Sequence, residues 1–203
     1  MQTDTAAKSR KLTISDILDH RAYERIRPGR QKEVFEIKRR RRIALGTMMT
    51  VMFENRETMQ AQIQEMLRVE KVLTDEGVLE ELNAYNPLIP EQGQLSATLF
   101  VELTTDAQVR EWLPKLVGIE RAIAIKLSNG DVVNAIVDEG HAEQLTRENV
   151  TAAVHYIRFE FSPQQIDEFA KGDVQLISIL PNYIEATELA EYTVSELLID
   201  LRD

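Results

Sequence analysis

Residues 122–137 read AIAIKLSNGDVVNAIV, and this stretch decides the fold class. Two runs rich in apolar and β-branched residues flank Asn129-Gly130. That dipeptide is the strongest short signal for a β-hairpin, because a type I′ turn needs positive φ at both central residues. A hairpin pairs its two strands antiparallel, so the sheet around it is expected to be antiparallel as well.

Outward from the hairpin, the apolar pattern predicts further strands and several helices. Residues 95–103 alternate apolar and polar side chains, with the period of two that is typical of a half-buried strand. Pro28 is expected to open a helix, and Thr193 with Glu196 forms a capping box that is expected to open the last one. The other predicted strands are 47–53, 154–161 and 174–180, and the predicted helices are 28–42, 56–75, 78–84, 106–116, 163–170 and one from 193. We therefore predict an α+β fold: a mainly antiparallel sheet of five or six strands, helices packed on one face, and an N-terminal helical arm.

Charge is divided unevenly along the chain. Residues 1–43 hold thirteen lysines and arginines against six acidic residues, whereas residues 44–203 hold eleven against twenty-eight. The formal net charge is −10. We predict a disordered tail over residues 1–10 and a single α+β domain over 11–203. Within that domain, residues 11–43 are expected to form a basic helical arm packed on the acidic body.

Composition excludes several classes of chemistry. The chain has no cysteine, so disulfides, thiolate catalysis and cysteine-ligated iron–sulfur or zinc sites are excluded. No apolar run approaches 18 residues, so no membrane span is expected. The start lacks a signal-peptide hydrophobic region, so we expect a cytoplasmic location. No nucleophile elbow, phosphate loop or dinucleotide fingerprint occurs.

Two charged residues on predicted apolar helix faces suggest a buried ion pair. Glu70 falls on the apolar stripe of the helix from Arg56, and Arg41 lies on the side of its helix that Val34 and Ile37 define. A desolvated carboxylate needs a partner, and arginine donates two parallel hydrogen bonds to one. We predict an Arg41–Glu70 contact, as a structural salt bridge or as part of a ligand site.

Three other residues are candidate ligand-binding groups. Glu54 and Arg56 flank the point where a predicted strand becomes a helix, and exposed backbone N–H groups at such junctions hold anions. Tyr85 precedes Asn86-Pro87 in a rigid polar loop. The alternative for each is a simple cap or turn.

The weak candidates for a metal site cluster after a predicted strand. Carboxylate oxygens and an imidazole nitrogen suit Mn, Fe or Zn. The cluster matches no spacing that specifies a metal site, so a solvated loop is the alternative and no cofactor is predicted. The residues are Asp138, Glu139, His141 and Glu143.

The basic run Lys38–Arg42 raises the possibility of nucleic-acid binding. Five consecutive helical positions point all round the axis, and no aromatic residues are interleaved for base stacking. We therefore expect these side chains to pair with the acidic residues of 54–81, and nucleic-acid binding through the arm remains a second alternative.

Several strings together resemble a bacterial family of uncharacterised proteins, catalogued as a domain of unknown function. They are KLT at 11–13, YERIRP at 23–28, KRRRRIALG at 38–46, FENR at 53–56, QEMLR at 64–68, EELNAYNPLIP at 80–90 and PNY at 181–183. Genes of this family often lie beside rubrerythrin-like and iron–sulfur oxidoreductase genes. The resemblance implies a cytoplasmic protein near redox or oxidative-stress chemistry, and it assigns no catalytic residue.

Two functions follow as hypotheses, beside the nucleic-acid binding considered above. The first is a non-catalytic accessory protein that binds a partner protein, such as a redox enzyme; we do not expect an enzyme but leave that open. The alternative is a small-ligand-binding protein or enzyme with a site between sheet and helices. A homodimer is also possible, through a sheet face that carries Ser96, Thr98, Tyr156 and Arg158.

Overall fold

The computed structural model describes residues 10–137 and 151–203 of the chain. Almost all of the expected disordered tail, residues 1–10, lies outside these ranges. The helices are η1 (Ile14–Asp16), α1 (His20–Arg41), α2 (Arg56–Glu70), α3 (Asp75–Tyr85), η2 (Asn86–Leu88), α4 (Asp106–Trp112), η3 (Ile119–Arg121), α6 (Pro163–Phe169) and α7 (Glu191–Arg202). The strands are β1 (Arg42–Leu45), β2 (Met49–Glu54), β3 (Gln94–Val101), β4 (Ile123–Lys126), β5 (Val132–Asn134), β6 (Ile136–Val137), β7 (Val154–Glu160), β8 (Gln175–Leu180) and β9 (Tyr183–Glu188).

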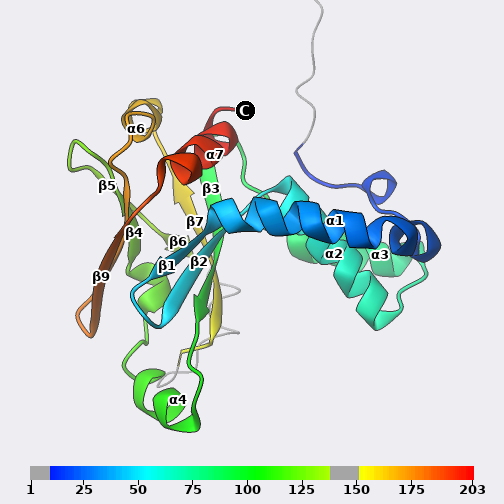
Figure 1. Cartoon of the computed structure of the whole chain (residues 1–203), viewed down its shortest axis with the longest axis horizontal. Helices are drawn as coiled ribbons and strands as arrows, with labels where there is room; N and C mark the ends of the chain where they lie inside the picture. The colour runs from blue at the N-terminus through cyan, green and yellow to red at the C-terminus, as the bar shows by residue number, and fades with distance from the viewer. Residues whose placement is uncertain (1–9, 138–150) are drawn as a thin grey trace, which may run out of the picture.

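The predicted α+β class and the antiparallel pairing are confirmed. The strands form two sheets, in the orders β1-β2-β3-β7-β6 and β5-β4-β8-β9, and every pairing is antiparallel. Only Ala135 separates β5 from β6, so the chain passes from one sheet to the other within one short bend. Figure 1 shows the two sheets facing each other, with α7 at one end and α4 at the other.

The opposite edges of the two sheets also meet. The Thr187 hydroxyl on β9 donates to the carbonyl of Ala44 on β1 at 2.8 Å, and the Tyr183 hydroxyl donates to the carbonyl of Leu45 at 2.7 Å. Side chains from both sheets then close one continuous core, where Phe53 and Phe159 lie 6.1 Å apart between ring centroids. Because both edges are joined, the two sheets surround the core like an incompletely paired barrel.

Gly46, in the turn between β1 and β2, makes this closure possible. Its φ is +65°, and an added Cβ would lie 2.4 Å from the Tyr183 hydroxyl oxygen. Gly46→Ala is therefore expected to lower the free energy of unfolding by about 1–3 kcal/mol, from left-handed backbone strain and the displaced tyrosine. Chemical denaturation measures this.

Gly29→Ala is the matched control for that change. Gly29 lies within α1, and nothing stands within 4 Å of an added Cβ. Alanine there is expected to stabilise by about 0.5–1 kcal/mol, because glycine is the poorer helix former. Equal effects from the two substitutions would contradict the role given to Gly46.

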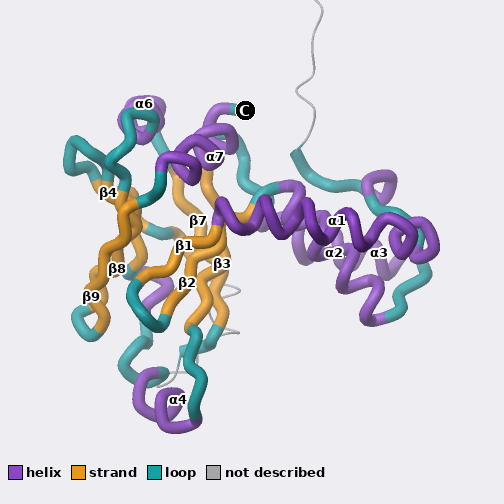
Figure 2. The backbone as a smooth tube through the Cα atoms, in the orientation of Figure 1, coloured by secondary structure: helices purple, strands orange, loops and turns teal. Residues whose placement is uncertain are grey.

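A second, smaller core lies outside the two sheets. We call η1, α1, α2, α3 and η2 the helical extension, and the two sheets with α4, α6 and α7 the two-sheet unit. The helical extension projects sideways from the two-sheet unit (Figures 1 and 2). Its own apolar cluster consists of Leu12, Met59, Ile63, Leu67, Leu82 and Ile89. The two parts are continuous through β2, which leads directly into α2.

Three local predictions are wrong. Helix α1 begins at His20, where the Asp19 side chain accepts from the Ala22 N–H, and Pro28 lies inside it. Contacts with α2 on both sides of the proline hold this helix together despite the missing hydrogen bond. In the hairpin, φ is positive at Gly130 but not at Asn129, so the turn is not type I′. Finally, the chain was predicted to have no strand after 174–180, but β9 follows β8 after Pro181-Asn182.

Candidate functional site

The most deeply buried charge in the described chain is the guanidinium of Arg41, at the end of α1. The residue is 1% exposed. Its two terminal nitrogens donate to the Asp200 carboxylate on α7 at 2.6 and 3.0 Å, and its Nε donates to Glu196 at 3.3 Å. Burial alone would lower the pKa of Arg41, but hydrogen bonds and charge from Asp200 and Glu196 raise it above its ordinary value. The arginine therefore stays charged and fastens α1 to α7.

The ionised form of the Asp200 carboxyl depends in turn on the charge of Arg41. Burial raises the pKa of the Asp200 carboxyl above its ordinary value, and the hydrogen bonds and charge of Arg41 oppose that rise. Arg10 adds a further contact, because its guanidinium donates to the backbone carbonyls of Asp200 and Pro90 at 3.0 and 3.1 Å. Arg10, Arg41 and Asp200 thus join the start of the described chain, the helical extension and α7.

The predicted Arg41–Glu70 contact is wrong. Glu70 is the exposed last residue of α2, and α2 runs antiparallel to α1, so Glu70 lies toward the opposite end of α1 from Arg41. A helical wheel assigns each residue to a face of its own helix, but it does not show which residues of two packed helices lie at the same level. The acidic partner on α2 is Glu65, which accepts from Arg27 at 2.7 Å.

The residues that do bind Arg41 were assigned another role from the sequence. The predicted capping box of Thr193 and Glu196 is absent, because α7 begins after Ala190. Instead the Thr193 hydroxyl donates to the Arg40 carbonyl at 2.8 Å, and Glu196 accepts from both Arg40 and Arg41. The spacing of Glu196 and Asp200, one helical turn, was the available signal for two carboxylates on one face.

The side chains of the basic run at the end of α1 point in different directions, as expected for consecutive positions on a helix. Arg39 pairs with Glu36 on the same helix, and Arg40 pairs with Glu196 at 3.1 Å. Arg42 lies over the Phe100 ring, 5.4 Å from its centroid. The expectation that this run pairs with acidic residues of 54–81 is wrong. Arg39 pairs with Glu36, Arg40 and Arg41 pair with carboxylates of α7, and Arg42 lies 3.9 Å from Glu102.

Glu54 and Arg56 sit on either side of the cap that begins α2. Glu54 is 5% exposed and accepts from the hydroxyls of Thr58 at 2.6 Å and Thr98 at 2.8 Å. Asn55 caps the helix by accepting from the Thr58 N–H at 3.0 Å. Arg56 forms an ion pair with Asp16 at 2.6 Å. Each of these groups is thus paired within the chain.

Tyr85, at the end of α3, packs against the apolar cluster of the helical extension. Burial is the main cause that raises the pKa of Tyr156, and the charges of Tyr85 and Glu54 add to it. Ser96 and Thr98, expected on an outward dimer face, are each 5% exposed and so are buried.

A model of the family described as "Protein of unknown function (DUF3501)" matches residues 11–201. The chain belongs to this family. It is also similar to a solved structure from Burkholderia pseudomallei K96243, described as a novel protein of unknown function, with 33% identity and a TM-score of 0.86. That likeness covers 94% of this chain and 99% of the other. A comparison with curated proteins found no match. The resemblance to a family of unknown function is thus confirmed.

The four metal-ligand candidates of this DUF3501 protein, Asp138, Glu139, His141 and Glu143, all lie outside the described residues. Within residues 10–137 and 151–203, no three potential ligands gather closely enough to hold a metal ion. Across the same ranges, the helices lack the length and apolar content needed to cross a bilayer.

His155 and Glu120 form a second buried polar group in this DUF3501 protein, and no sequence pattern indicated that they lie close together. His155 is 1% exposed, and its Nε2 lies 2.8 Å from the Thr151 hydroxyl and 3.0 Å from the Ala152 carbonyl. Burial lowers the pKa of His155, and the nearby Glu120 raises it in part. Glu120 is 4% exposed, and its Oε2 has no hydrogen-bond partner among the described residues. Burial thus favours the neutral form of this imidazole.

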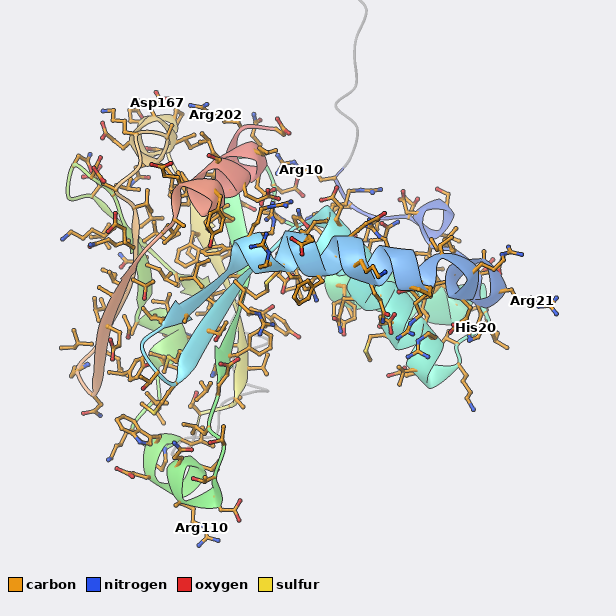
Figure 3. The ribbon with its side chains drawn as sticks, in the orientation of Figure 1. Arg10, His20, Arg21, Arg110, Asp167 and Arg202 are labelled. Carbon is orange, nitrogen blue, oxygen red and sulfur yellow. The ribbon has the colours of Figure 1, made fainter. Side chains whose placement is uncertain are left out.

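The remaining face of α1 is cationic and open to solvent. Arg21, Arg25 and Lys32 are exposed and, within the described residues, form no ion pair. Their spacings of four and seven residues place them on one side of the helix. The buried residues Tyr23, Val34 and Arg41 lie on the other side. Figure 3 shows Arg21 at the end of α1 farthest from the two-sheet unit.

Glu65 gives the contact between α1 and α2 a pH dependence. Hydrogen bonds from Arg27 are the main cause that lowers the pKa of Glu65 to about 2; burial opposes them, and Tyr23 and Arg68 assist. A carboxyl with a lowered pKa stabilises the fold above its unfolded value of 4.5, and this stabilisation is lost as the pH falls toward 2.

Glu65→Gln is therefore expected to cost about 1–2 kcal/mol of unfolding free energy at pH 7, less than the full shift implies because the site is partly solvated. At about pH 3 the difference from wild type is expected to shrink. Urea denaturation at both pH values measures it. A difference that is equal at pH 7 and pH 3 would contradict the assignment.

Proposed function

We propose that this protein is a non-catalytic accessory protein that binds the acidic surface of a partner protein through the outer face of α1. The observation that carries the proposal is the row of cations Arg21, Arg25 and Lys32 on a projecting helix. These three are exposed and form no ion pair within residues 10–137 and 151–203, whereas the buried Arg41 is neutralised by Asp200. Clustered cations on one surface speed association with an acidic partner and select its orientation.

The contacts of the other candidates support a binding role over an enzymatic one. Arg41 and Arg56 are neutralised by carboxylates of the same chain, and Glu54 is hydrogen-bonded by two threonines. Such groups fix the fold and have little capacity left for a substrate. From the family resemblance we further propose that the partner belongs to redox or oxidative-stress systems of the cytoplasm.

The test is a charge reversal with a matched control. Arg25→Glu/Lys32→Glu changes two cations of the row on α1, and Arg110→Glu/Lys126→Glu makes the same change of net charge on α4 and β4. All four residues are exposed. The proposal expects a partner captured from lysate by the wild type and by the control pair, and lost with the α1 pair. It would be overturned if capture were equal with both pairs or if no protein were captured.

Nucleic-acid binding is a distinct outcome of the same variants. Counterion release makes such binding steeply salt-dependent. Binding of the wild type to duplex DNA or RNA at low salt, abolished by the α1 pair, would replace the protein partner with a nucleic acid. Fluorescence anisotropy with labelled duplexes measures this directly.

A further inference from the structure

Helix α1 carries a second exposed face, beside the cationic row. Pro28, Gln31, Phe35 and Lys38 follow each other at intervals of three, four and three residues, which places them along one line of the helix. Phe35 is 65% exposed, the largest exposure of any aromatic ring among the described residues that expose large apolar side chains. An aromatic ring held in water on a rigid helix is typical of an interface anchor.

A cleft of about 290 Å³ runs alongside this line, between α1 and α2. Its apolar floor is formed by Val34 and Ala61, which are 9% and 8% exposed. Tyr23, Gln31 and Phe35 of α1 also line it. The cleft is open along α1, so another helix laid beside α1 can place a side chain in it.

The charges on this face of α1 are arranged so that they can pair with the same face of a second copy. Glu24 and Lys38 both stand seven residues from Gln31, two helical turns on either side of it. If two α1 helices lie parallel, Glu24 meets Glu24 and Lys38 meets Lys38. If they lie antiparallel about Gln31, each Glu24 meets a Lys38, twice by symmetry, and the two helix dipoles also oppose.

We infer that this face of α1 is covered by α1 of a second copy of the chain, antiparallel and related by a two-fold axis at Gln31. In that arrangement Phe35 of each copy lies opposite residues 27 and 28 of the other, alongside the cleft between α1 and α2. Glu24 and Lys38 form reciprocal ion pairs at the two ends. The cationic row of Arg21, Arg25 and Lys32 borders this face, and Lys32 lines a surface hollow together with Pro28, Gln31 and Phe35.

The first test is the mass in solution. Sedimentation equilibrium of the full chain is expected to give twice the 23.3 kDa chain mass, and Phe35→Ser to give the single-chain mass with an unchanged circular dichroism spectrum. Ile184→Ser is the control, because Ile184 is 74% exposed on β9, away from α1. A monomeric wild type, or a Phe35→Ser variant that stays dimeric, overturns the inference.

The second test separates this geometry from any other dimer. Glu24→Lys and Lys38→Glu are each expected to raise the dimer dissociation constant, and the double variant to restore it, because the pairs re-form with reversed sign. Glu24 also lies 3.8 Å from Arg68 of its own chain, a contact that the double variant does not rebuild. Restoration therefore reports the contact between copies, and additive weakening in the double variant overturns it.

The absence of cysteine allows a direct probe of the axis. Gln31→Cys introduces a single thiol into the chain. A disulfide needs Cα atoms within about 7 Å, which only residues at or next to the two-fold axis satisfy. Mild oxidation is expected to give a covalent dimer for Gln31→Cys and none for Arg21→Cys at the helix end. Cross-linking at Arg21 but not at Gln31 contradicts the proposed axis.

Discussion

Arg41→Ala is expected to lower the free energy of unfolding by about 3–5 kcal/mol. The loss comes chiefly from Asp200, whose side chain is 11% exposed and would remain buried without its cation. Glu196 keeps Arg40 as a partner, so it contributes less to the loss. Chemical denaturation at pH 7 measures the change, and Arg39→Ala, at an exposed position on the same helix, is expected to stay within about 0.5 kcal/mol of wild type.

A double variant distinguishes a stranded charge from lost packing. Arg41→Leu/Asp200→Leu removes both charges, and it is expected to be more stable than either single variant because no unpaired ion remains. If Arg41→Ala costs less than about 0.5 kcal/mol, Arg41 does not fasten α1 to α7.

Ile63→Ala is expected to lower the free energy of unfolding by about 2–5 kcal/mol. Ile63 is fully buried at the centre of the small core of the helical extension, where Leu67 and Leu82 also pack. The cavity left by the smaller side chain cannot close easily between α2 and its neighbours. Ile184→Ala makes the same chemical change at an exposed position and is expected to have a small effect.

The shape of the Ile63→Ala transition carries further information. Because β2 leads directly into α2 and Arg41 joins α1 to α7, the two cores are expected to unfold together. Far-ultraviolet circular dichroism and the fluorescence of Trp112, which lies on α4 in the two-sheet unit, are then expected to give coincident transitions. An earlier loss of helical signal would show that the helical extension unfolds separately.

Local patterns predicted most elements of the fold. The alternation over residues 95–103 identified β3, and the apolar runs around Asn129-Gly130 identified β4 and β5 as a hairpin. The turn type was wrong because only Gly130 adopts positive φ. Strand β9 was missed because Ile184 is exposed and acidic residues interrupt its pattern, so the strand lacks the apolar run that burial produces.

The candidate site was harder to predict than the fold. A helical wheel showed that Arg41 faces inward, and Arg41 is indeed buried, but the wheel contains no information on which distant element supplies the carboxylate. Asp200 lies 159 residues further along the chain. Pairings of such separation depend on how whole elements dock, which no short pattern records. By contrast, the position of Arg21, Arg25 and Lys32 on one side of α1 follows from spacing alone, once the buried side of the helix is known.

The same 159-residue separation has a consequence for synthesis on the ribosome. Translation proceeds from the N-terminus, so α1 emerges well before α7, and the Arg41 guanidinium lacks Glu196 and Asp200 until α7 is made. The contacts of α1 with α2, such as that of Arg27 with Glu65, join residues 38 apart and can form as soon as α2 has emerged. A nascent chain stalled before α7 would therefore carry a helix pair whose Arg41 end is not yet fastened to the two-sheet unit.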